Sequence, residues 1–85
     1  MNFILTGHAE TEMRRRQIDR ESVAAVMAAP EQVVEGVGGR KVYQGKVECG
    51  GKMYLVRLIV EDWHSPAIVV TVYRTSKIEK YWRPQ

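Results

Sequence analysis

Hydrophobic residues near the start of the chain recur with the period of a helix. Leu5, Ala9 and Met13 stand four positions apart, a spacing that places apolar side chains on one face of an α-helix. Thr6 is a suitable N-cap, because its hydroxyl can accept a hydrogen bond from the first helical turn. The pattern predicts a first helix from Thr6 to about Arg16 with a narrow apolar stripe.

A second helical pattern follows directly. Asp19 is another good N-cap, and Val23, Val26 and Met27 then share one face. Pro30 ends this helix, since a proline disfavours helical conformation in the residue before it. Two short amphipathic helices are therefore expected in the first third of the chain.

After Pro30 the hydrophobic period changes to two, which is typical of β-strands. The alternation predicts four strands, over residues 32–37, 40–48, 52–62 and 67–75. Glycine pairs at 38–39 and 50–51 fit tight hairpin turns, and short hairpin links join antiparallel neighbours. Residues 76–83 have the spacing for a final helical turn or two.

Together these elements predict one α+β domain over residues 1–85. It has two N-terminal helices packed on a four-stranded antiparallel sheet and a short C-terminal helix. The opposite side of the last two strands is also largely apolar, apart from Arg57 and Thr71, so we expect the C-terminal helix or a partner to cover part of it. The side chains expected to face the helices are Tyr54, Val56, Leu58, Val60, Ile68, Val70 and Val72.

The net charge of +3 lies entirely in the last twelve residues. The preceding part of the chain carries nine basic and nine acidic side chains, whereas Arg74, Lys77, Lys80 and Arg83 are opposed by Glu79 alone. A local basic cluster points to an anionic partner, so Lys77, Lys80 and Arg83 are candidate contacts for an RNA backbone. The alternative is a solvated terminal helix whose basic residues serve solubility.

Composition excludes several other classes. With 45% hydrophobic and 27% charged residues the chain is globular, and its apolar runs are too short to span a bilayer. The start lacks a basic flank and a cleavage site, and the single Cys49 cannot form an internal disulfide, so a cytoplasmic location is expected. His8, His64 and Cys49 lack the spacing of metal ligands, and no glycine-rich loop precedes a helix, so no cofactor is expected.

Four residues are candidates for chemistry. His8 lies four residues before Glu12, whose carboxylate can fix the tautomer of the imidazole, although a local hydrogen bond at the helix start explains it equally simply. Arg57 interrupts an apolar strand face and Arg74 ends the last strand, so each needs a carboxylate or a phosphate as partner. Tyr73 is suited to stacking on a base or to ordinary sheet packing.

His8-Ala9, Met13, Arg16 and Ile18 stand in the order His-Ala-x-x-x-Met-x-x-Arg-x-Ile. This order resembles the opening pattern of the domain-of-unknown-function family 4258, His-Ala-x-x-Arg-Met-x-x-Arg-x-Ile. One position departs from the pattern, because Glu12 stands where the family has its first arginine. Further similar segments are Asp19–Val23, Ala29–Glu31 and Thr71–Arg74.

The resemblance implies a fold similar to the RelE and BrnT toxins, with two helices on an antiparallel sheet. It also implies a functional region at an arginine near the end of the last strand and a basic C-terminal helix. Arg74, Glu79 and Tyr81 are similar in kind to the Arg, Glu and Tyr that follow the last strand of BrnT-like toxins, although their spacing differs.

Two hypotheses follow. In the first, the chain binds RNA or cleaves it without a metal, by attack of a ribose 2′-hydroxyl on the adjacent phosphate. Arg57 and Arg74 then hold the phosphate, His8 is the acid or base, Tyr73 positions a base, and Arg16 joins the basic tail in binding RNA. In the second, the apolar sheet face of a non-catalytic module binds an antitoxin-like protein or a second copy of the chain.

Overall fold

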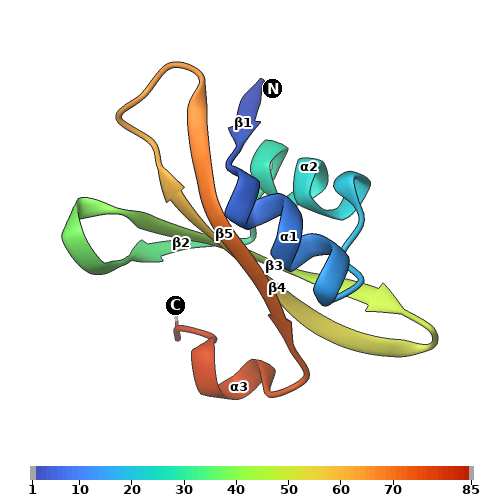
Figure 1. Cartoon of the computed structure of the whole chain (residues 1–85). Helices are drawn as coiled ribbons and strands as arrows, with labels where there is room; N and C mark the ends of the chain where they lie inside the picture. Colours follow the sequence, from blue (N-terminus) through green and yellow to red (C-terminus); the bar gives the residue numbers. More distant parts are fainter. Residues whose placement is uncertain (1, 85) are drawn as a thin grey trace.

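A sheet of five strands forms the centre of the α+β fold, as the computed structural model shows for residues 2–84 (Figure 1). Helices α1 and α2 lie on one side of this sheet and α3 on the other. We refer to the face covered by α1 and α2 as the helical face and to the opposite one as the second face. The elements are β1 (Phe3–Leu5), α1 (Gly7–Arg15), α2 (Arg20–Ala28), β2 (Gln32–Glu35), a 3₁₀ turn (Val37–Gly39), β3 (Lys41–Cys49), β4 (Lys52–Glu61), β5 (Ala67–Thr75) and α3 (Ile78–Tyr81).

The sheet is mixed, which corrects the expected four-stranded antiparallel arrangement. Its order is β1-β5-β4-β3-β2, and the additional strand β1 runs parallel to β5, with Phe3 opposite Ala67 and Leu5 opposite Val69. Three residues are too few to display a period of two, and the spacing of Leu5 also fits the apolar stripe of the first helix. The other neighbouring strands are antiparallel, as the short hairpin links predict.

The predicted caps of both long helices are confirmed. The side chain of Thr6 accepts a hydrogen bond from the backbone nitrogen of Ala9 at 3.0 Å, and that of Asp19 accepts one from Ser22 at 2.7 Å. The Thr6 hydroxyl also donates to the carbonyl oxygen of Val70 at 2.8 Å. This residue therefore starts α1 and fixes the helix start to β5.

A β-bulge in β5 decides which of its residues enter the core. Val60 is opposite Val69 but Ile59 is opposite Thr71, so Val70 has no partner on β4. A bulge of this kind reverses the alternation beyond it. Val69 and Val72 therefore join the core, and the expectation that Ile68 and Val70 would face the helices is wrong. The buried core residues are Ala9, Met13, Ile18, Val23, Val26, Met27, Val56, Leu58, Val60, Val69 and Val72.

The other differences between the expected and the observed elements are small. The strand expected over residues 32–37 ends at Glu35, because Gly38 and Gly39 have φ values of 69° and 80° and belong to the following turn. The predicted helical turn in the tail is present as α3, and the chain after it runs back toward β2 (Figure 1).

No helix within residues 2–84 has the length and apolar character needed to cross a membrane.

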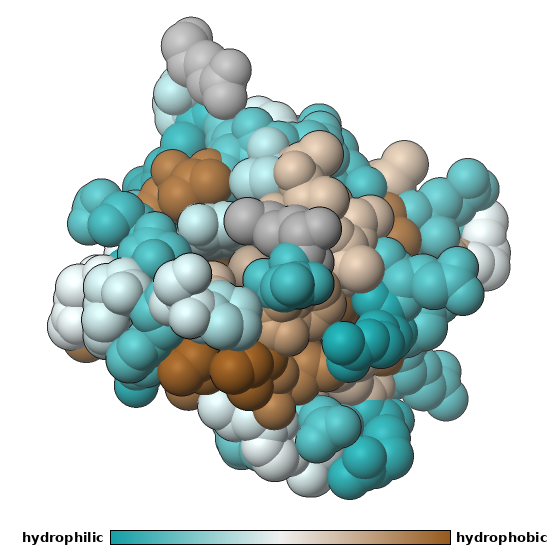
Figure 2. Space-filling model, turned by 90° about the horizontal axis from the view of Figure 1, so that it is seen from above, coloured by the Kyte–Doolittle hydropathy of each residue, from teal (hydrophilic) through white to brown (hydrophobic). Residues whose placement is uncertain are grey.

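Apolar side chains are exposed in several places on the surface. Seen from above, brown and tan side chains form a patch that is bordered by hydrophilic ones (Figure 2). The large apolar side chains that are most exposed come from five different parts of the chain: Ile4, Val33, Val37, Met53 and Trp63.

The turn between α1 and α2 holds a residue in an unfavourable backbone conformation. Gln17 has a φ of 55°, in the left-handed region that favours glycine. The backbone nitrogen of Gln17 donates to the carbonyl of Arg14 at 3.3 Å, and that of Ile18 donates to Met13 at 2.8 Å. This is the hydrogen-bond pattern with which many helices end, usually at a glycine.

We expect Gln17→Gly to raise the free energy of unfolding by about 1 kcal/mol, because a side chain in this conformation costs about that much. Gln17→Ala, which keeps the Cβ atom, is the matched control and should not stabilise the protein. Urea unfolding of the three proteins measures the difference. A glycine variant no more stable than the alanine variant would contradict the interpretation.

Candidate functional site

A row of four polar side chains crosses the second face of the sheet. Gln32 on β2 stands opposite Gln44 on β3, Gln44 stands opposite Arg57 on β4, and Arg57 stands opposite Tyr73 on β5. Directly opposite residues of antiparallel strands share a face, so the strand register alone brings these four side chains together. Only Arg57 and Tyr73 were singled out from the sequence.

Hydrogen bonds connect the row from end to end. Gln44 donates from Nε2 to Oε1 of Gln32 at 2.8 Å, and Arg57 donates from Nε to Oε1 of Gln44 at 2.8 Å. Nη1 of Arg57 donates to the hydroxyl of Tyr73. The Gln44 amide therefore acts as donor on one side and acceptor on the other, which fixes its orientation.

The C-terminal segment closes over this row through its backbone. Gln32 donates from Nε2 to the carbonyl oxygen of Arg83 at 2.6 Å and accepts from the Arg83 nitrogen at 3.0 Å. Gln44 donates from Nε2 to the carbonyl oxygen of Tyr81 at 3.2 Å. Because only backbone atoms of residue 83 are used, its guanidinium stays exposed.

Arg57 is the unusual member of the row, since it is a cation with only 8% of its surface exposed. Its Cζ atom lies 4.3 Å from the ring centroid of Tyr81 and 5.6 Å from that of Tyr73. Within residues 2–84 no carboxylate forms an ion pair with it. Neutral acceptors and aromatic faces compensate a buried charge only in part, so the site keeps a positive charge.

One edge of this guanidinium is not used by the described residues. Within residues 2–84 the hydrogen bonds of Arg57 are made by Nε and Nη1 and none by Nη2, and 8% of the residue's surface is exposed. The partner expected from the sequence was a carboxylate or a phosphate, but the contacts present are an amide and a hydroxyl. An anion that reaches Nη2 would supply the missing negative charge.

Basic and aromatic side chains surround the row. Nζ of Lys46, on the second face of β3, lies 4.2 Å from the ring centroid of Trp82. Lys77, Lys80 and Arg83 are exposed along the tail. This edge of the molecule therefore presents several cations close to aromatic rings.

Arg16, which directly follows α1, lies near the β5 end of the row. Its Cζ atom lies 6.0 Å from the Tyr73 ring, and its Nε donates to the carboxylate of Glu12 at 2.9 Å. Hydrogen bonds from Arg15 and Arg16 lower the pKa of Glu12. Residues four positions apart on a helix can pair in this way, and the ion pair partly neutralises Arg16.

The other two candidates for chemistry lie elsewhere. Arg74 is opposite Val56, on the helical face, so its side chain and that of Arg57 point to opposite sides of the sheet. One phosphate cannot contact both. His8 is exposed in the first turn of α1, and the carboxylate of Glu12 is occupied by arginines rather than by the imidazole.

Reasoning from the sequence missed Gln32, Gln44 and Trp82. The sequence gives a weak sign that Gln44 is special, because this polar residue lies two positions after the apolar Val42 and so shares a strand face with it. What assigns it to the site is its register with Arg57, and the chain sequence alone does not fix that register.

Residues 5–74 match a protein family described as Domain of unknown function (DUF4258). The matched range contains the whole row and Arg74 and ends before α3. No curated protein and no solved structure matches the chain.

The row makes a prediction about stability. Gln44→Met should lower the free energy of unfolding by about 2–3 kcal/mol, because the buried guanidinium loses its acceptor and Gln32 loses a donor. Gln44→Glu should cost less at neutral pH, since a carboxylate oxygen still accepts from Arg57 and compensates its charge. Urea unfolding tests both variants, and a Gln44→Met protein as stable as wild type would show that the row contributes nothing to folding.

Proposed function

Because the chain belongs to the DUF4258 family, whose function is unknown, we propose a function from its geometry: the second face and the C-terminal segment bind single-stranded RNA. The observation that carries the proposal is Arg57, a buried guanidinium that has no carboxylate partner within residues 2–84 and whose Nη2 makes no hydrogen bond there. A phosphate supplies the negative charge that the described residues do not place beside Arg57.

RNA explains the surroundings of Arg57 better than a simple anion does. Single-stranded nucleic acids are bound by cations that follow the backbone and by aromatic rings on which bases stack. Tyr73, Tyr81 and Trp82 provide rings, and Tyr81 and Trp82 are only half-buried. Lys46 and the exposed basic residues of the tail provide cations next to them.

RNA cleavage, as in the RelE and BrnT toxins, is a more specific form of the same proposal. It needs a proton acceptor and a proton donor beside the phosphate. Arg57 and the Tyr73 hydroxyl are in contact, whereas His8 and Arg74 lie away from them. The geometry therefore supports binding better than cleavage, and incubating single-stranded RNA with the protein in EDTA separates the two.

The alternative of an apolar docking face for a protein partner has weaker support. The centre of the second face is a hydrogen-bonded row of polar side chains, so it offers no continuous apolar surface. The exposed apolar side chains are spread over several elements.

The basic tail gives the test of RNA binding. The triple variant Lys77→Gln, Lys80→Gln, Arg83→Gln keeps the helix propensity and the backbone contacts of residue 83, and its stability should change by less than about 1 kcal/mol. RNA affinity should fall, and the salt dependence should flatten by up to about two log-log units for three contacts on a single strand. Fluorescence anisotropy over a range of salt concentrations measures both.

The matched control removes three exposed basic residues from other parts of the chain: Arg14→Gln, Arg15→Gln and Lys52→Gln. It changes the net charge equally, so an effect of overall charge would appear in both variants. Equal losses in the two variants, or no salt-dependent binding by the wild type, would overturn the proposal.

A further inference from the structure

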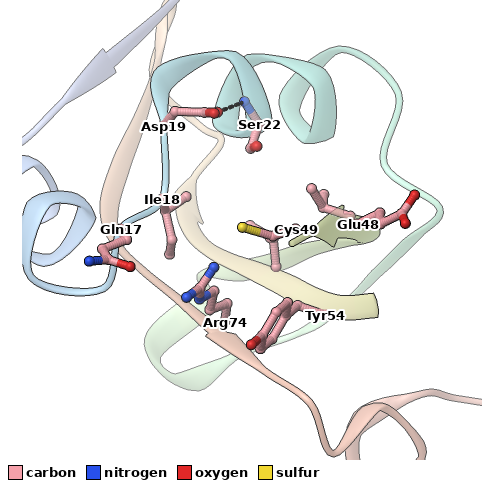
Figure 3. A pocket seen from close by; sticks show the side chains of 10 residues that line it. Gln17, Ile18, Asp19, Ser22, Glu48, Cys49, Tyr54 and Arg74 are labelled. Carbon is pink, nitrogen blue, oxygen red and sulfur yellow. Dashed lines mark hydrogen bonds between the residues drawn. The ribbon is translucent and has the colours of Figure 1, made fainter. Parts of the chain in front are cut away.

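A second unpartnered arginine lies on the helical face, in a cavity of about 60 Å³ between the α1–α2 turn and the β3–β4 hairpin (Figure 3). Within residues 2–84 Arg74 makes no ion pair and no side-chain hydrogen bond, although it is half-buried. Its Cζ atom lies 4.3 Å from the ring centroid of Tyr54. Stacking on a ring holds a guanidinium by its flat side and leaves its N–H donors free.

Polar groups gather around the free donors. Figure 3 shows the Arg74 guanidinium and the Cys49 sulfur directed into the space below Ile18, with Gln17 at the rim and Ser22 above. Ile18, Val47 and Val56 supply apolar walls. Apolar walls beside a charged donor strengthen a hydrogen bond formed there, because water screens it less.

Two carboxylates also line the cavity, but neither compensates Arg74. Asp19 is turned toward α2 and accepts from the backbone nitrogen of Ser22 at 2.7 Å, and this contact lowers the pKa of Asp19. The carboxylate of Glu48 points away from the guanidinium (Figure 3). The start of α2 is thus already capped by Asp19, and the cation left for a ligand is Arg74.

We propose that this cavity binds a small oxyanion group, a carboxylate or a phosphate, through Arg74. The volume admits a few water-sized groups, which suits one such group and excludes a whole nucleotide. The conformation of Gln17 fits this role, since a glycine would be favoured there but would remove a polar side chain from the rim. The site is independent of the RNA-binding face, because Arg57 and Arg74 lie on opposite sides of the sheet.

Titrations with sodium phosphate and with sodium acetate, at constant ionic strength against chloride, test the site by amide NMR. We expect saturable shifts at Ile18, Asp19, Ser22 and Cys49. Arg74→Gln should weaken the binding about tenfold or more, the value of a charge-assisted hydrogen bond. Arg14→Gln, which removes an exposed arginine from α1, should leave the affinity unchanged.

Saturation with only one of the two anions identifies the oxyanion as phosphate or carboxylate, and saturation with both shows a site without preference. The Nε–H resonance of Arg74 in the wild-type protein reports on the same contact without a mutation, so a variant that fails to fold does not block the test. Linear shifts with both anions, an unmoved Arg74 resonance, or equal affinity in a folded Arg74→Gln protein would overturn the proposal. Anion binding unchanged by the triple tail variant would show that the two sites are separate.

Discussion

The arrangement of polar groups on the second face depends on one buried cation, Arg57. Arg57 lies under the C-terminal segment, and within residues 2–84 its charge is balanced by an amide oxygen, a hydroxyl and two aromatic rings but by no carboxylate. A guanidinium in this setting costs free energy that a carboxylate or an apolar residue would avoid. Residues kept at such a cost are characteristic of functional sites, and the proposal of RNA binding proceeds from this charge.

The rest of the second face serves to hold that guanidinium. Gln44 presents its oxygen to Arg57 because its nitrogen is held by Gln32 and by the backbone of Tyr81. Gln32 in turn pairs with both backbone groups of Arg83 and so fixes the end of the chain against β2. The same contacts that orient Arg57 therefore carry the basic tail to the edge of the site, where its side chains remain exposed.

Local signals in the sequence predicted the local structure. Both helix caps, the hairpin turns and the bounds of β5 follow from residues that are close together in the chain, such as Asp19 and Ser22. The parallel strand β1 and the bulge at Val70 did not follow, because each depends on a partner more than fifty residues away or on a neighbouring strand. The same distinction holds for the site. Arg57 stood out as a charge on an apolar strand, but its contacts with Gln44 and Tyr73 became apparent only from the register of the strands.

Compensating the charge of Arg57 while leaving the residue in place tests the central claim most directly. Gln44→Glu places a carboxylate against the guanidinium, and Gln17→Glu makes the same chemical change at an exposed turn on the opposite side of the sheet. If Arg57 binds RNA through its uncompensated charge, single-stranded RNA should bind Gln44→Glu at least about tenfold more weakly than Gln17→Glu, the value of one charge-assisted contact. Equal affinities of two folded variants would contradict the account.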